Sequence, residues 1–557
     1  MRSAKLLLGL SVACASGLLA SSARATSVFE FPDNGSEQMA RGGAWVARAS
    51  DPLATIFNPA GLAGQPTRLT LQSSFIIEHT CFSRIKAAGD TSNDPLGAGG
   101  VYPRVCNDIA PTFNPQIGAT IRVNDRLGVG LLVIGPASGG EKTFPDFVRD
   151  GAGELQASPA RYLLAKQAGI ILSPTLGVGA EIVENLRVGA SFSWGFARLR
   201  LASATVSLNS DATTPGNDTR ANLQLRDYFI PAFTVGGLWS AAPEWDLAGW
   251  YKWSDAIRAS GDVGTAANFY TRQNANGDDS KVRYGDTIFE DCGTGTNTTA
   301  CGAGNNGTLK FAVPMEAKIG VRYHKPRAKT VAEAPAGAEP SALATPAAPQ
   351  KHLRDPLATD VFDVELDLTW ANNSAADAIE IRFPSDNSGT GLLPVAGVQG
   401  GQIPPNADQR RNYRDVIGVR LGGDWNVIAD KLALRAGSFF ESSAANPQYQ
   451  HIDFQPTTRF GLALGGTYRI RFGEGESASA LELMVGYGHV FFGDQSRTNP
   501  NDSGLGALAG TSCNGSAPSG VTTCADGNER YRTKWPVNLG TITSSLNVVN
   551  VGAAYRF

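Results

Sequence analysis

Cysteine is the residue type whose spacing in this chain most clearly implies chemistry. Of the seven cysteines, Cys14 lies near the N-terminus and the others form neighbouring pairs, namely Cys81 with Cys106, Cys292 with Cys301, and Cys513 with Cys524. Each pair lies in a stretch rich in Gly, Asn, Asp, Thr and Ser, without the CxxC spacing or histidine partners of a zinc site. We therefore predict no metal and three disulfides, each stapling one loop in an oxidising compartment; unpaired surface thiols are the alternative.

Motifs for catalysis are absent from the sequence. It contains no G-x-S-x-G, H-E-x-x-H or G-x-x-x-x-G-K-[ST] pattern, and its five histidines are scattered without partners at ligand spacing. We therefore expect neither an enzyme nor a cofactor. The composition also excludes a general affinity for nucleic acid, because the net charge is -3 and the pI is near 6.0.

Apolar and polar residues alternate in strand-length runs through most of the chain. In 361–370 the even-numbered residues are apolar, while Asp363, Glu365, Asp367 and Thr369 form the other face. Three acids on one face suit the wet lumen of a barrel whose opposite face meets lipid, although a soluble sandwich strand can also alternate.

A second run, 309–323, alternates over more residues than an ordinary domain strand needs. We expect its odd-numbered residues, including Leu309 and Phe311, to face lipid, and Lys310, Lys318 and Arg322 to face the lumen. Membrane strands need ~9–11 residues, whereas strands of soluble domains cluster near ~5–6. With these two runs, about fourteen strands are expected; the others are 67–79, 112–123, 127–137, 163–182, 185–203, 226–240, 245–260, 412–428, 431–441, 459–471, 479–493 and 542–557.

The connections between these runs alternate between tight turns and long loops, as in an outer-membrane barrel. If the first strand runs outward, both termini are periplasmic, every long loop is extracellular, and all three cysteine pairs lie outside. One connection breaks the pattern, because 325–358 is long and rich in Ala and Pro. We expect it to be a flexible periplasmic insertion.

The segment 26–66, before the first strand, has the composition of a plug. Its paired glycines, Asp51-Pro52 and Asn58-Pro59 break any long helix, and its small residues do not favour a strand. A barrel of about fourteen strands is wider than side chains alone can fill. We therefore expect this segment to fold inside the barrel as a hatch.

Residues 1–25 have the pattern of an export signal. Arg2 and Lys5 precede an apolar run, and Ala23-Arg24-Ala25 fits a signal-peptidase site, so we expect the mature chain to begin at Thr26. Lipoprotein cleavage before Cys14 is the alternative. No later stretch has the ~20 apolar residues of a spanning helix.

Several blocks of the sequence resemble the outer-membrane transporters of long-chain fatty acids and aromatic hydrocarbons (FadL/TodX type). They are NPAGL at 58–62, preceded by ARGGAWVARASDP, and three late blocks at 363–383, 414–444 and 483–494. The final strand ends on Phe557, which resembles the signal that the barrel-assembly machinery reads. The resemblance covers most of the mature chain and implies an all-β, monomeric, fourteen-stranded antiparallel barrel closed by an N-terminal hatch.

The resemblance also implies roles for particular residues. Gating would depend on the hatch turn Asn58, Pro59, Ala60 and Gly61, and substrate would leave sideways at a kink in the third strand at Gly135 and Pro136. A simple turn and a simple strand end are the alternatives. Candidate cations for a substrate carboxylate are Arg414, where the family pattern tends to carry a basic residue, with Arg420 and Lys318; each is otherwise an ordinary lumen charge.

The expected function is therefore transport of a small hydrophobic or amphipathic molecule across the outer membrane. The expected partners are that substrate, membrane lipid with lipopolysaccharide, and the assembly machinery, with no nucleic acid. A structural or adhesive barrel with stapled loops is the alternative, and a lipase barrel would need a serine beside His489. Fatty acid, alkane, monoaromatic and lipid-like signal remain open as ligands.

Overall fold

The computed structural model describes residues 34–557 except 91–95, 97–99, 136–141, 150–152, 154, 207–217, 268–269, 271–305, 328–352, 383–392, 395–401, 404–407, 474–477, 503–520, 524–528 and 532–535. The export signal, Pro136 and the pairs Cys292/Cys301 and Cys513/Cys524 lie outside the described residues. None of the helices within the described part has the length and apolar character needed to cross a membrane.

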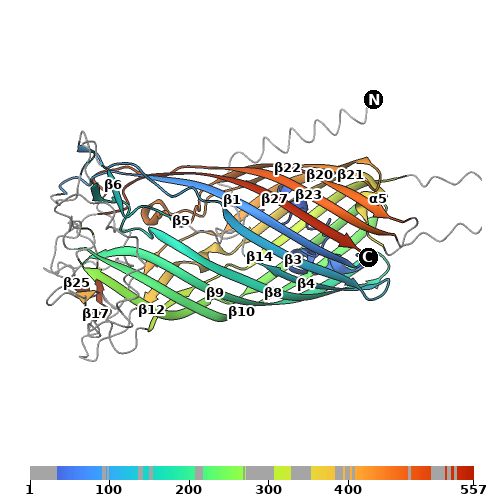
Figure 1. Ribbon diagram of the computed structural model, residues 1–557, viewed down its shortest axis with the longest axis horizontal. Coiled ribbons are helices and arrows are strands. Elements are labelled where there is room, and N and C mark those ends of the chain that lie inside the picture. The colour runs from blue at the N-terminus through green and yellow to red at the C-terminus, as the bar shows by residue number, and fades with distance from the viewer. Residues whose placement is uncertain are drawn as a thin grey trace, which may run out of the picture.

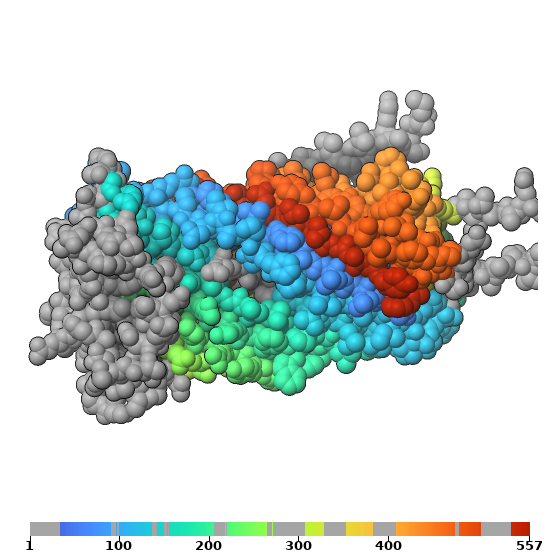
Figure 2. Space-filling view, viewed as in Figure 1, coloured from blue at the N-terminus to red at the C-terminus, as the bar shows by residue number. Residues whose placement is uncertain are grey.

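The wall is a closed antiparallel barrel of fourteen strands, as the alternation predicted (Figure 1). Each strand pairs with its neighbour in the chain, and the last pairs with the first along the whole of both, from Arg68 opposite Arg556 to Arg84 opposite Gly540. This closing seam is visible where the C-terminal strand crosses beside the first (Figure 2). The strands are β1 (Arg68–Arg84), β3 (Thr112–Arg122), β4 (Leu127–Ile134), β8 (Lys166–Val183), β9 (Leu186–Val206), β10 (Asp218–Ala242), β11 (Trp245–Ser254), β14 (Glu316–Pro326), β15 (Asp360–Ala371), β20 (Val416–Ile428), β21 (Leu432–Glu441), β22 (Arg459–Phe472), β23 (Ser479–Phe492) and β27 (Gly540–Arg556).

Three of these strands are interrupted and continue as a second piece. β11 continues into β12 (Ile257–Ala267), β13 (Asn306–Phe311) precedes β14, and β16 (Ala378–Arg382) follows β15 after a short 3-10 turn, η5 (Asn373–Ala375). β12 pairs with both β10 and β13, and β13 pairs with β16, so the wall stays continuous past the breaks.

Shorter elements occupy the long connections. They are β2 (Val105–Cys106), β5 (Lys142–Thr143), β6 (Phe147–Arg149), β7 (Leu155–Ala157), β17 (Leu393–Pro394), β18 (Gln402–Ile403), β19 (Gln409–Arg410), η6 (Pro447–Tyr449), β24 (Gln495–Arg497), β25 (Val521–Thr523) and β26 (Glu529–Tyr531). Cys81 and Cys106, on β1 and β2, form the first predicted disulfide. The long connections lie at one end of the barrel, and the C-terminus and short turns lie at the other (Figure 1).

The outer face of the barrel is apolar and the inner face is charged in the half nearer the short turns. On β15, Val364, Leu366 and Leu368 are exposed, while Asp363 and Glu365 are buried, as predicted. An apolar belt around a closed barrel is the surface that lipid favours.

The expected facing of 309–323 is wrong at its beginning. On β13, Leu309 and Phe311 are buried and point inward, while the Lys310 side chain is 54% exposed. On β14 the pattern is reversed, because Lys318 is buried and Ile319 is 61% exposed. The interruption at 312–315, which contains Pro314, inverts the phase of the alternation, so the single run is two strand pieces.

The described part of the predicted hatch, residues 34–66, lies inside the barrel. It contains α2 (Ser36–Ala40), α3 (Ala54–Phe57) and the 3-10 helix η1 (Pro59–Leu62). Residues 34–66 are all buried. The stretch 325–358 is structured at both ends, since β14 includes Lys325 and Pro326 and α5 (Pro356–Thr359) lies at the barrel end that carries the short turns (Figure 1). Its middle, 328–352, lies outside the described residues.

Candidate functional site

The hatch turn at Asn58 is built by one side chain that makes three hydrogen bonds. The Asn58 Oδ1 accepts from the Ala60 amide at 3.2 Å and caps η1. Its Nδ2 donates to the Val46 carbonyl at 2.8 Å, within the hatch, and to the Gly237 carbonyl of the wall at 3.3 Å. Pro59 follows at the first position of η1, where a missing N–H is tolerated. Asn58 thus joins two hatch segments to β10.

Glycines line the part of the wall that faces this turn. A Cβ on Gly189 would lie 2.2 Å from the Pro59 carbonyl carbon, and one on Gly236 would lie 2.1 Å from the Asn58 Oδ1. Both distances are far shorter than any van der Waals contact, so only glycine permits this approach. The complementary surfaces of η1 and the wall therefore support a plug and not a tail that floats in the lumen.

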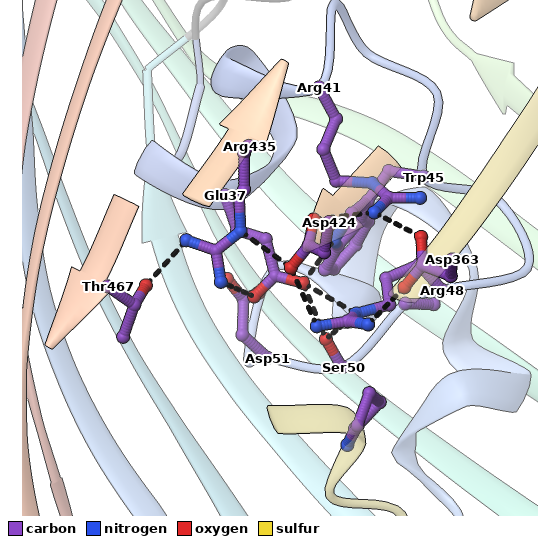
Figure 3. Close-up of polar contacts among 12 residues, drawn as sticks. Glu37, Arg41, Trp45, Arg48, Ser50, Asp51, Asp363, Asp424, Arg435 and Thr467 are labelled. Carbon is purple, nitrogen blue, oxygen red and sulfur yellow. Dashed lines mark hydrogen bonds and ion pairs between the residues drawn. The ribbon is translucent and has the colours of Figure 1, made fainter. Parts of the chain in front are cut away.

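A buried ion cluster holds the rest of the hatch (Figure 3). Arg41 Nη1 lies 2.6 Å from carboxylate oxygens of both Asp363 and Asp424, and its Nη2 lies 3.1 Å from Glu365. Arg48 lies 2.5 Å from Asp363 and 3.0 Å from Asp424. Hatch cations thus meet lumen acids from β15 and β20, and each buried charge has a partner, as burial demands.

Two acids of the hatch titrate in opposite directions. Burial alone would raise the pKa of Glu37, but Arg48 and Arg435 outweigh it and hold that pKa well below the ordinary value. Burial, followed by the charge of Glu37, raises the pKa of Asp51 to about 7. Asp51 is therefore the hatch group poised to change charge near neutral pH.

An apolar cavity of about 210 Å³ lies between the hatch and the end of the barrel that carries the long connections. Ile56 and Phe57 of the hatch contribute to its lining, and Leu309, Phe311 and Phe454 line it from the wall and a loop. The Phe311 and Phe454 rings stack with centroids 6.0 Å apart. The inverted phase of β13 turns Leu309 and Phe311 inward, so the break in the strand creates this part of the apolar lining.

The polar groups of the cavity are few. Lys252 on β11 and Glu316 on β14 both line it and are directly opposite in the strand register. Among the described residues, no ion pair or hydrogen bond of the Lys252 ammonium is recorded, and the group is only partly buried. The remaining polar lining is Asn34, Gln167, Ser173, Ser193 and Ser254. The cavity is thus an apolar slot with one basic and one acidic residue on its wall, a combination suited to an amphiphile.

The described pairing of β8 beside the cavity comes in two stretches. The β4–β8 ladder ends at Ile134 opposite Ser173, and β5 pairs with β8 at Lys142 opposite Gln167. Gly135 follows the end of the first ladder and lines the cavity together with Ile171. Residues 136–141, between the two stretches, lie outside the described residues, and the recorded partners of 168–172 on β8 are on β9.

Comparison with solved structures places the fold. A FadL homologue from Pseudomonas aeruginosa aligns over 95% of this chain and 99% of its own, with a TM-score of 0.60 and 14% identity. The toluene transporters TodX of Pseudomonas putida and TbuX of Ralstonia pickettii cover the same shares, with TM-scores of 0.51 and 0.50 and identities of 13% and 12%. The chain has the FadL/TodX fold. No family model matches the sequence, and no curated protein matches it.

The predicted cations lie in different surroundings within this FadL/TodX-type barrel. Arg414 is exposed, precedes β20 and does not line the cavity, so the expectation of a lumen position fails. Arg420 is buried and paired with Glu441 at 2.8 Å, which makes it an ordinary lumen charge. The Lys318 ammonium lies over the rings of Phe57 and Trp250, at 5.5 and 5.1 Å from their centroids, and supports the hatch from below the cavity.

Sequence reasoning missed the cover of the cavity and its cation. Ser158–Ala165 is buried throughout, and Leu164 from this segment lines the cavity. Arg161 and Tyr162 anchor it to Asp218 at 2.7 and 2.8 Å. Lys252 was passed over because an isolated lysine in an alternating strand gives no local sign of facing a cavity; its register opposite Glu316 is a long-range fact.

Proposed function

We propose that this chain is an outer-membrane channel for uptake of small hydrophobic or amphipathic molecules. The observation that supports it is the cavity, because an apolar slot closed on one side by a hatch has no purpose in a purely structural barrel. Solved proteins of this fold are described as toluene transporters and a monoaromatic hydrocarbon channel. An adhesive barrel would need its loops but not the cavity.

The route follows from the polarity of the lumen. Below the cavity lies the ion cluster of Arg41, Arg48 and the β15 acids, which an apolar solute cannot enter without stripping charges of their partners. Beside the cavity, where the described β4–β8 ladder ends, we propose a gap in the wall at Gly135 that leads toward lipid. Apolar molecules are transferred favourably into lipid. We therefore propose that movement of the hatch turn at 58–61 releases substrate sideways through this gap.

The cation of the cavity bears on the choice of ligand. A carboxylate bound near the Lys252 ammonium would form a charge-assisted contact while its apolar part lies against Leu309 and Phe311. We propose Lys252, in place of Arg414 and Arg420, as the residue that selects an acidic head group. Relative to the unaltered protein, Lys252→Met should weaken the binding of acids more than the binding of neutral hydrocarbons of the same size. This difference separates the two substrate classes.

The placement of the chain in the cell completes the proposal. We propose that residues 1–25 are an export signal, that the mature chain starts at Thr26, and that both termini are periplasmic. The barrel would then be a monomer in outer-membrane lipid and lipopolysaccharide, inserted by the assembly machinery and without enzymatic activity. The long connections, including the Cys81–Cys106 disulfide, would be extracellular.

A filled cavity tests the proposal. Ala232 on β10 lines the cavity, and Val235 on the same strand is exposed on the outer face, so Ala232→Phe and Val235→Phe form a matched pair. In cells lacking their own hydrophobic transporter, Ala232→Phe should lower uptake of labelled fatty acid and of toluene by roughly tenfold or more. Val235→Phe should leave uptake unchanged. Equal uptake by two assembled variants would remove the cavity from the route.

A further inference from the structure

The segment Leu353–Thr359, here called the strap, carries the chain from the Ala/Pro-rich insertion back into the barrel. It ends in α5, at the end of the barrel that holds the short turns (Figure 1). Its Asp355 and Leu357 are buried, at 6% and 4% exposure. A turn that only joins two strands lies outside the barrel mouth, whereas this segment enters it and reaches the hatch.

Asp355 fixes the strap to the wall. Both of its carboxylate oxygens accept hydrogen bonds from Arg469 of β22, each at 2.8 Å, and Arg556 of β27 forms a further ion pair. The Asn426 side chain of β20 donates to the Pro356 carbonyl at 2.8 Å. The strap is therefore anchored to three strands and is a rigid support.

Arg354, one residue earlier, holds the hatch. Its Nη2 donates to the Ala47 carbonyl at 2.9 Å and the Arg48 carbonyl at 3.0 Å. Its own backbone N–H donates to the Gly64 carbonyl at 2.8 Å. The strap thus grips two hatch positions that enclose the turn at 58–61.

The hatch segment 45–48, which Arg354 contacts, is held from its other side by β15. The Trp45 amide donates to Asp367 at 2.8 Å, and the Ala47 amide donates to Glu365 at 2.6 Å. The amide protons of 45–48 therefore point to the wall, while the carbonyls of Ala47 and Arg48 point to Arg354. The wall contact pairs neutral amides with carboxylates, and the strap contact pairs a guanidinium with neutral carbonyls, so the strap is a second hold on the same segment.

The surroundings of Arg354 make its contact easier to release than an ion pair. No ion pair joins it to any carboxylate of the described residues; Arg48, Arg187 and Arg322 are cationic neighbours, and Asp246 is an acidic one. Burial, followed by the charge of Arg187, lowers the pKa of Arg354 to about 9. The guanidinium is held by carbonyl dipoles against electrostatic repulsion.

We propose that Arg354 is a positioning residue that latches the hatch shut from the side of the short turns. The meaning of hatch opening rests on the proposed function, but the latch itself does not depend on which solute is carried.

The test compares two arginines at opposite ends of the insertion. Arg327 donates to the Asn426 carbonyl of the wall at 2.7 Å and, among the described residues, forms no hydrogen bond to the hatch. Full-length Arg354→Ala, Arg354→Lys and Arg327→Ala proteins are refolded, checked for barrel assembly by heat-modifiable mobility, and inserted in planar bilayers. Ion conductance reports hatch closure independently of hydrophobic uptake.

Arg354→Ala should raise the open fraction about tenfold, which corresponds to about 1.4 kcal/mol, with assembly unchanged. Arg354→Lys keeps a donor on a long stem and should lie between Arg354→Ala and the unaltered protein, and Arg327→Ala should match the unaltered protein. Equal conductance of assembled Arg354→Ala and unaltered protein overturns the latch, as does an equal rise in Arg327→Ala. Amide hydrogen exchange at 45–48 decides the same question if the alanine variant assembles poorly, because Arg354→Lys should already speed exchange there. The effect of cavity filling on uptake tests the proposed function alone, because conductance and hydrogen exchange are the measurements that test the latch.

Discussion

Single residues of the hatch each join segments that are distant in sequence. Asn58 ties η1 to Val46 and to Gly237, and Arg41 and Arg48 tie the hatch to β15 and β20. Because the lumen side chains are buried and polar, removing one partner leaves the other unpaired. The sensitivity of the hatch to substitution should therefore exceed that of the wall around it.

Replacing Asn58 should loosen the hatch without harming the barrel. Asn58→Ala leaves the Val46 carbonyl without a donor, which should lower local stability by about 1–3 kcal/mol. We expect faster hydrogen exchange at 45–62 and impaired uptake. Asn446→Ala is the control, because Asn446 caps η6 through the Gln448 amide in the same way but lies outside the hatch. If both variants transport alike, the Asn58 turn has no gating role.

Asp51 should make hatch closure dependent on pH. Its pKa is raised from 3.8 to about 7, so the folded hatch retains a proton that the unfolded segment has lost. The stability that this proton contributes, on the order of a few kcal/mol, is complete below pH 3.8 and is lost as pH rises to about 7. Conductance of the unaltered protein should rise between about pH 4 and pH 7.

Asp51→Asn carries a permanent neutral group and should flatten that pH profile at its closed, acid-side level. Glu37 does not interfere, because its lowered pKa places its own loss of stability at pH below 4.5. A variant profile as steep as that of the unaltered protein would assign the pH dependence to another group.

At the scale of elements, interruptions of the strands create the functional features. The breaks within β11/β12 and β13/β14 invert the facing of the side chains, so that apolar residues of β12 and β13 line the cavity. Unbroken strands would keep one facing throughout. Under the proposed function, substrate binding depends on these breaks, and exit depends on the end of the β4–β8 ladder at Ile134.

Filling the gap beside β4 should separate binding from uptake. A Cβ on Gly135 would lie 2.8 Å from the Asn114 Oδ1 and 3.3 Å from the Ile171 carbonyl, so a leucine there fits after a small movement of a flexible side chain. Gly135→Leu should bind hydrophobic ligand nearly as the unaltered protein does and transport it at least about fivefold more slowly.

Gly249→Leu is the matched control for this element. Its nearest contacts would be at 3.3 Å, in a stretch of β11 that is paired on both sides. Unaltered binding and uptake are expected for it. Normal uptake by Gly135→Leu in cells, with assembly verified, would place the exit elsewhere.

At the scale of the whole molecule, the wall can assemble without the hatch, but its buried acids need the hatch arginines for neutralisation. Every wall strand pairs with other wall strands, so closure of the barrel does not require the hatch. The hatch supplies Arg41 and Arg48, which neutralise acids of β15 and β20. Removing the hatch should therefore change both the size and the charge of the lumen.

Deleting Ser27–Ala49 should leave an assembled barrel with an open pore. We expect higher single-channel conductance and a preference for cations, because Asp363, Glu365 and Asp424 lose their hatch partners and face water. Reversal potentials in a salt gradient measure the preference. A folded deletion variant that conducts no better than the intact protein would show that this segment is not the plug.

The sequence alone determined the features that depend on local pattern. The period of two located all fourteen strands, short turns and long loops set their order, and the Gly/Pro-rich start predicted a hatch. What tertiary structure decided was phase and register. Alternation fixes which residues share a face but not whether a break inverts that face, so Leu309 and Phe311 turned inward against expectation. Pairing of distant strands placed Lys252 in the cavity, and packing of 353–359 against the wall placed Arg354 beside the hatch. Neither position leaves a local trace, because each depends on contacts between segments far apart in the chain.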